Sequence, residues 1–141
     1  MFYEQRMSVP DSPEQLRSEY EADLEEIIET TGLDQISLLT GVDEETLEAI
    51  RTGETPSLSL EDAAQIQSQG TDDPDPETIE TMACEHLLLG MSTAVLDVDA
   101  VESELGIDLD AKEIQQKIER RAPMSFEEYV HLQHVIAGNA P

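Results

Sequence analysis

Apolar residues recur every three or four positions over most of the chain, which is the spacing of one face of an α-helix. The clearest stripe lies within residues 13–31 and consists of Leu16, Tyr20, Leu24, Ile27 and Ile28. Ser12 followed by Pro13 predicts the start of this helix, because serine is a favoured N-cap and proline a favoured first residue. Gly32 predicts its end.

Seven further helices are predicted from the same signals. They are a short helix with Ile36 and Leu39 ended by Gly41, one from Asp43 to Gly53, one after Ser59, one after Asp75-Pro76, and helices at Val98–Leu105, Ala111–Arg121 and Phe126–Ala137. Asp110 with Glu113 and Ser125 with Glu128 have the spacing of capping boxes. Alternation with a period of two residues, which would indicate strands, never extends beyond a few positions. The predicted fold class is therefore all-α.

Residues 69–76 separate two helical units. Their sequence, QGTDDPDP, contains glycine, proline and aspartate but no apolar residue, which is typical of a linker. We therefore predict a unit at 1–68, an acidic Pro/Gly linker at 69–76 and a second unit at 77–141. The domain organisation is thus two small helical units within one short chain.

The second unit resembles the first. The matching positions are Gly41-Val42 with Gly106-Ile107, Leu47 and Ile50 with Ile114 and Ile118, Pro56 with Pro123, and Leu60-Glu61-Asp62 with Phe126-Glu127-Glu128. The match requires a two-residue insertion before the third helix of the second unit. A diverged repeat and a chance likeness between two acidic helical stretches are both open interpretations.

The stretch Met82–Leu96 is apolar on most of its faces. A helix that is hydrophobic all round is normally buried. We expect it either to form the central helix around which the two units pack or to complete a core across a homodimer.

The net charge is −26, from 33 acidic and 7 basic side chains. Such a charge argues against electropositive nucleic-acid binding, and against docking on an anionic membrane. It destabilises a compact protein at low salt, and halophiles are a known context for it, because molar salt shortens the Debye length to about 3 Å. We therefore expect a cytoplasmic protein of a salt-accumulating cell; the alternative is an ordinary acidic protein with a basic partner.

Residues 33–67 resemble the helix-turn-helix of Cro- and repressor-type DNA-binding domains. The matching positions are Ile36-Ser37, Gly41-Val42, Thr46-Leu47, Ile50, Gly53, Pro56-Ser57-Leu58, Ala64 and Ile66. The resemblance implies that the helix after Asp43 enters the major groove of DNA. The other interpretation is that the motif serves only as a packing module.

The whole chain also resembles a small haloarchaeal protein family of unknown function. The segments that carry this resemblance are MFYEQRM, HLLLGMSTAVLDVD and KEIQQKIERRAPMSFEEY. It implies an origin in high salt and implies no activity.

Two groups of residues are candidates for binding a nucleic acid or a partner. In the helix-turn-helix they are Gln35, Glu44, Glu45 and Arg51, where carboxylates could accept from cytosine and Gln35 or Arg51 could meet phosphate. In the second unit they are Gln116, Lys117, Arg120 and Arg121, which belong to the neutral C-terminal thirty residues. A solvated helix end, where cations complement the helix dipole, would also explain the second group.

No catalytic, metal or cofactor signature is present. The single cysteine, Cys84, excludes an internal disulfide, and Cys84 and His86 point in different directions on a helix. We therefore expect a non-enzymatic protein without metal or cofactor. The leading hypothesis is a small DNA-associated transcriptional regulator acting in high salt, as a homodimer through Met82–Leu96. The alternatives are an adaptor for a basic protein and a ribosome- or RNA-associated factor.

Overall fold

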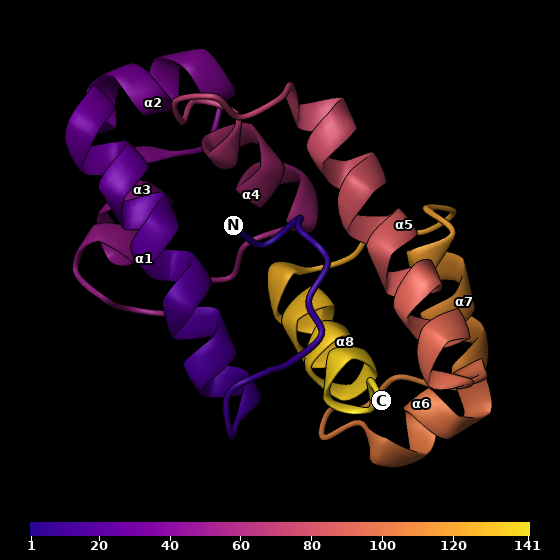
Figure 1. The fold of residues 1–141 in the computed structure, drawn as a ribbon. Coiled ribbons are helices and arrows are strands. Elements are labelled where there is room, and N and C mark those ends of the chain that lie inside the picture. The colour runs from indigo at the N-terminus through magenta and orange to yellow at the C-terminus, as the bar shows by residue number, and fades with distance from the viewer.

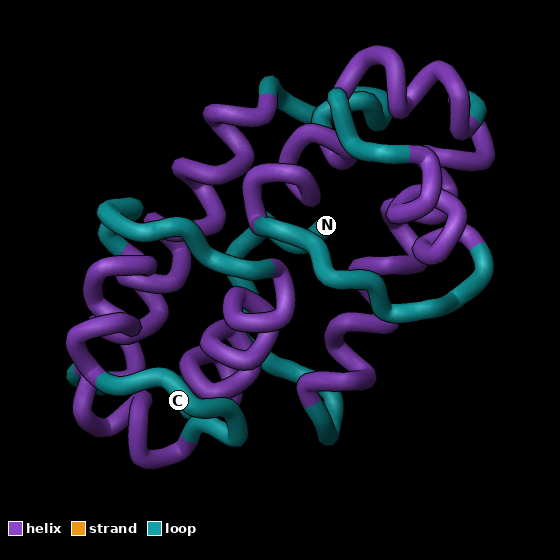
Figure 2. The backbone as a smooth tube through the Cα atoms, turned by 180° about the vertical axis from the view of Figure 1, so that it is seen from behind, coloured by secondary structure: helices purple, strands orange, loops and turns teal.

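Eight helices form in the computed structural model, which describes all 141 residues (Figure 1). They are α1 (Pro13–Thr31), α2 (Leu33–Thr40), α3 (Glu44–Arg51), α4 (Leu60–Gln67), α5 (Pro76–Ala94), α6 (Val98–Glu104), α7 (Ala111–Ile118) and α8 (Phe126–Gly138). Helices and loops make up the whole chain, and it contains no β-strand (Figure 2). The all-α prediction is confirmed, and α7 ends three residues earlier than predicted.

Side-chain caps set where the helices begin. Seven of the eight helices are preceded by a side chain that accepts a hydrogen bond from a backbone N–H in the first turn of the helix. These side chains are Ser12, Asp43, Ser59, Asp75, Asp97, Asp110 and Ser125. Such bonds satisfy donors that have no partner within a helix. Both predicted capping boxes, at Asp110 and Ser125, are present.

The helices of the two units bury side chains at matching positions. Helix α1 buries Leu16, Tyr20, Leu24 and Ile28, and α5 buries Ile79, Ala83, Leu87 and Met91 at the same intervals from its first proline. Helix α4 buries Leu60, Ala63, Ala64, Ile66 and Gln67, and α8 buries Phe126, Tyr129, Val130, Leu132 and Gln133. The likeness seen in the sequence therefore extends to which side chains face the core.

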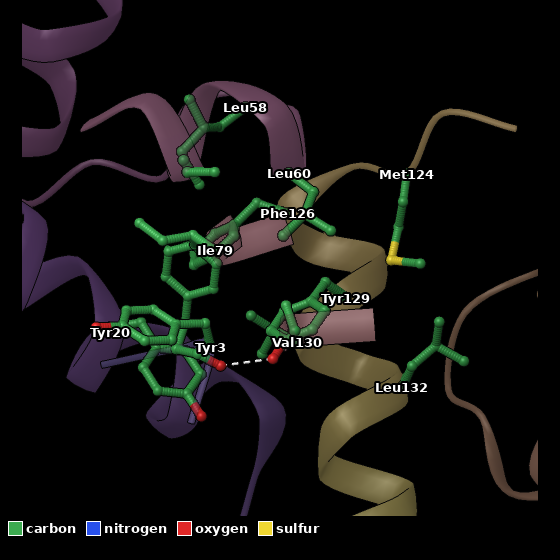
Figure 3. Close-up of a cluster of buried hydrophobic side chains, with 14 of the residues drawn as sticks. Tyr3, Tyr20, Leu58, Leu60, Ile79, Met124, Phe126, Tyr129, Val130 and Leu132 are labelled. Carbon is green, nitrogen blue, oxygen red and sulfur yellow. Dashed lines mark hydrogen bonds between the residues drawn. The ribbon is translucent and has the colours of Figure 1, made fainter. Parts of the chain in front are cut away.

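One continuous core joins both units. Thirty buried apolar residues from all eight helices and the N-terminal segment form a single cluster. Aromatic rings fill its centre, where Tyr20, Phe126 and Tyr129 lie together (Figure 3). The two predicted units consequently share their interior, and the boundaries at 68 and 77 stay a prediction about the chain's organisation.

The N-terminal segment is part of this core. Phe2 is fully buried against the rings of Tyr20, Phe126 and Tyr129, and the Tyr129 hydroxyl donates to the carbonyl of Phe2. The segment then runs between α1 and α8 to the start of α1 (Figure 1). Phe2 therefore ties the first helix of one unit to the last helix of the other.

The stretch Met82–Leu96, expected either to be the central helix or to complete a core across a homodimer, lies mostly in α5 and is buried on one side only. Leu88 and Leu89 on α5 are 45% and 49% exposed, so this helix has an outer face in contact with solvent. Helix α8 lies between α1 and α5 in Figure 1, and it contacts α1, α4, α5 and α6. Hydropathy alone cannot separate a buried helix from an amphipathic one whose outer face carries leucines. None of the eight helices combines the length and hydrophobicity needed to cross a lipid bilayer.

Candidate functional site

In the segment where the sequence predicts a helix-turn-helix, a short turn joins α2 to α3. Gly41 adopts a left-handed conformation with φ of 79°, which glycine tolerates without steric cost. The Ser37 hydroxyl donates to the Val42 carbonyl (2.7 Å), and the Val42 N–H donates to Thr40 Oγ1 (3.2 Å). Val42, Leu47 and Ile50 are buried and hold α3 against the rest of the unit.

The outward side of α3 is acidic. Glu44 and Glu45 are exposed at its N-terminal end, beside the capping carboxylate of Asp43. Gln35 and Arg51 line one open depression, together with Glu48. Arg51 is paired with Glu48 at 2.6 Å, so its charge is already matched within the helix. Three exposed carboxylates would therefore face any phosphate that approached this end of the helix.

The second group of candidate residues lies at the junction of the two units. Lys117, Arg120 and Arg121 line a pocket of about 310 Å³ with Cys84 and Glu80 in its wall. Gln116 is half-buried on α7 and does not line this pocket. The structure thus brings together three of the four residues in this group, and it keeps them apart from Gln35 and Arg51, which line a different depression.

Each base in this pocket is held by a carboxylate of the same chain. Lys117 Nζ lies 2.7 Å from Glu128, Arg120 pairs with Glu77 (3.1 Å) and Glu80 (2.9 Å), and Arg121 pairs with Glu119. Burial raises the pKa of Glu80 more than Arg120 lowers it. The pocket is therefore lined by matched charges and is not an open anion site.

Arg120 occupies a backbone position that favours glycine. Its φ is 64°, and the corresponding turn after α3 has Gly53 with φ of 82°. Both turns close with the same backbone bond, from Arg121 N–H to Gln116 O and from Glu54 N–H to Ala49 O. The left-handed conformation costs a non-glycine residue about 1–2 kcal/mol, and here it accompanies an arginine that bridges α7 and α5.

Cys84 lacks the environment of a reactive thiol. It is buried, and burial raises its pKa to about 11. A reactive cysteine requires the opposite shift, since the thiolate is the nucleophile. No group of three or more histidine, cysteine or acidic side chains has the geometry of a metal site.

Exposed apolar side chains are the feature that the sequence pattern did not reveal. Leu88 and Leu89 lie in the C-terminal half of α5, Val95 directly follows this helix and is 89% exposed, and Leu38 and Leu39 lie on α2. Val95 also has a positive φ of 56°, which is rare for a β-branched residue. The run of three leucines at 87–89 was a usable signal, because three consecutive helix positions span about 200° of the helix surface and cannot all face one core.

These features define a small acidic all-α protein. The chain belongs to the family of unknown function DUF5791, whose model matches residues 16–139. No curated protein and no solved structure matches it. The expected resemblance to a family of unknown function is confirmed; the haloarchaeal origin and the Cro-type relationship stay predictions.

Proposed function

We propose that this protein is an interaction adaptor that binds a basic protein partner. The observation that carries the proposal is the pairing of its bases: of the seven lysine and arginine side chains, all but Lys112 form ion pairs within the chain. The free charge on the surface is therefore almost entirely carboxylate. Such a surface attracts cationic partners and steers their approach.

DNA binding through α3 has weaker support. Phosphate contacts normally come from free lysine and arginine, and this helix offers one arginine that is already paired. A protein that bound DNA through this helix would also have to bring Glu44 and Glu45 close to the phosphate backbone. The helix-turn-helix-like pair is better explained as a packing unit, because its turn and its buried side chains complete the common core.

The outer face of α5 is the docking surface that fits this proposal best. Leu88 and Leu89 are exposed on this helix, and Val95 is exposed directly after its last residue. The exposed charges nearest to them in the sequence are acidic: Glu85, Asp97 and Asp99. An apolar stripe with an acidic rim is complementary to an amphipathic helix that carries apolar anchors between lysines or arginines.

A second copy of the chain fits this face less well. The same acidic rim would meet itself across a two-fold interface, and like charges placed opposite one another disfavour association. Homodimerisation through Met82–Leu96 is therefore the competing outcome of the test.

A synthetic amphipathic helix of leucine and lysine is the probe. We expect fluorescence anisotropy to show saturable binding of this peptide to the protein in about 1 M KCl. At that salt concentration, nonspecific electrostatic attraction between the peptide and the acidic surface is screened. Leu88→Gln should weaken binding about tenfold, since a buried leucine anchor contributes about 1.5–3 kcal/mol. Leu38→Gln on α2 is the matched control and should bind like the unmodified protein.

Three results would overturn the proposal. One is equal weakening by Leu88→Gln and Leu38→Gln. Another is a dimer in light scattering that Leu88→Gln dissociates. The third is saturable, sequence-selective binding to duplex DNA that Arg51→Glu or Lys117→Glu abolishes.

A further inference from the structure

The N-terminal segment, residues 1–11, is attached to the rest of the protein through side chains alone. Its single backbone–backbone hydrogen bond is internal, from the Glu4 N–H to the Met1 carbonyl (3.4 Å). The family match, which begins at residue 16, does not include it. Segments with few backbone bonds are the ones that open locally while the rest of a protein stays folded. This segment can therefore leave without breaking a backbone hydrogen bond of any helix.

Two buried donors on α8 hold the segment at its second residue. Tyr129 Oη and Gln133 Nε2 both donate to the carbonyl of Phe2. The Tyr129 and Gln133 side chains are 0% and 3% exposed, so neither can turn to bulk water. A buried donor without an acceptor is costly, and the pair therefore specifies a backbone carbonyl at this point.

Two histidines hold carbonyl oxygens further along the segment. His86 Nδ1 lies 2.7 Å from the carbonyl oxygen of Tyr3, and His134 Nε2 lies 2.8 Å from that of Pro10. A carbonyl only accepts hydrogen bonds, so each ring nitrogen is the donor. The histidines belong to α5 and α8. The second unit thus grips an extended segment that leads into the first helix of the other unit.

Two side chains of the segment are recognised as well. The Phe2 ring is fully buried, with its centroid 5.3 Å from that of Phe126. Four residues later, Arg6 pairs with Glu19 at 2.9 Å and lies over the Tyr20 ring at 5.8 Å from its centroid. The groove between α1 and α8 that holds the segment (Figure 1) therefore selects an aromatic ring, a backbone carbonyl and a cation at a fixed spacing.

We propose that this groove is a peptide-binding site that the N-terminal segment occupies in the free protein. In the complex, an extended partner segment with an aromatic residue and an arginine four positions later takes its place. When Phe2 departs, it leaves a ring-sized space and two buried donors without an acceptor, which a segment of the same chemistry fills again. The site is separate from the docking surface on α5 and does not depend on it.

A fluorescent peptide with the sequence of residues 1–8, MFYEQRMS, is the probe. We expect fluorescence anisotropy to show saturable binding of this peptide to the full chain in about 1 M KCl. The affinity should be weak, because the tethered segment competes at an effective concentration in the millimolar range. The peptide that carries Phe2→Ala should bind at least tenfold more weakly, since its buried aromatic ring is lost.

His134→Ala and His131→Ala are the matched pair of protein variants. His134 holds Pro10, which the peptide lacks, so its loss loosens the protein's own segment without touching the contacts of the peptide. We expect His134→Ala to bind the peptide about three- to tenfold more tightly, because the competitor has lost one hydrogen bond. His131 lies on the same helix and holds no carbonyl of the segment, so His131→Ala should bind the peptide like the unmodified protein.

Phe2→Ala in the protein tests whether the segment detaches as a unit. We expect this variant to keep its helical circular dichroism spectrum, to melt at a lower temperature, and to regain part of the loss when the peptide is added. Loss of the helical spectrum would show that the segment is inseparable from the core and would overturn the proposal.

Three binding results would overturn it as well. They are absence of saturable binding, equal binding of the peptide that carries Phe2→Ala, and equal affinities of His134→Ala and the unmodified protein, which would mean that the peptide binds elsewhere. Leu88→Gln should bind this peptide like the unmodified protein, so failure of the docking surface on α5 and failure of the groove are distinguishable.

Discussion

Ser59 and Ser125 face each other across an antiparallel bridge, and each also caps the helix that follows it. The Leu60 N–H donates to Met124 O (2.9 Å), and the Phe126 N–H donates to Leu58 O (2.7 Å). The two bonds are reciprocal, so the units meet through equivalent residues. Around this junction, α4 contacts both α5 and α8, and α1 contacts both α4 and α8.

Removing either serine hydroxyl should lower the thermodynamic stability of the whole folded protein. Ser59→Ala and Ser125→Ala should each lower the free energy of unfolding by about 1 kcal/mol, the usual cost of losing an N-cap. Because one core spans both units, urea denaturation followed by circular dichroism should show one transition in each variant. Two separated transitions would mean that the units fold independently.

Glycine at position 90 allows α5 and α8 to approach closely. A Cβ there would lie 2.7 Å from Ile136 Cγ2, and Ile136 is buried. Gly90→Ala should lower the free energy of unfolding by about 1 kcal/mol, because overpacking outweighs the gain in helix propensity. Gly106→Ala, whose Cβ would meet nothing within 4 Å, is the control and should be close to neutral. Thermal denaturation of both variants checks this, and a more stable Gly90→Ala would contradict it.

The sequence predicted the helices well because their signals are local. Caps such as Asp43 and Ser125, and glycines such as Gly32, act within one turn of the chain. It could not predict that Phe2 enters the core, since nothing in a short N-terminal segment encodes contacts with α1 and α8. The ion pairs of Arg120 with α5 were hidden for the same reason: their partners lie about forty residues away.

The stability of the Lys117–Glu128 pair should depend on pH. Burial opposes ionisation of Glu128, but hydrogen bonds from Lys117 and the Ser125 N–H outweigh it and hold the pKa of Glu128 below its ordinary value. A lowered folded-state pKa stabilises the protein above the ordinary value of 4.5, and this contribution is lost as the pH falls through the lowered value. NMR titration should show the pKa of Glu128 rising in Lys117→Met. An unchanged pKa would mean that the pair is not formed in solution.

Salt should stabilise this protein. The net charge of −26 opposes the compact state, and raising KCl from about 0.1 M to about 1 M shortens the Debye length from about 10 Å to about 3 Å. The melting temperature should rise by several degrees, which corresponds to about 1 kcal/mol or more for a chain of this size. Tetramethylammonium chloride at equal ionic strength should give a similar rise if screening is the cause. A fall in melting temperature would show that ion pairs contribute more than repulsion.

We expect Val95 to contribute to partner binding and to lower the stability of the folded protein. It has a φ of 56° and an 89% exposed side chain, so it packs against almost nothing while its backbone is strained. Val95→Gly should raise the free energy of unfolding by about 1 kcal/mol, because glycine adopts this conformation without a steric penalty. The same change should weaken binding of the leucine–lysine helix, because it removes an apolar contact from the docking face on α5. Denaturation and anisotropy on one sample of the variant measure both effects. Higher stability with unchanged affinity would show that Val95 takes no part in docking.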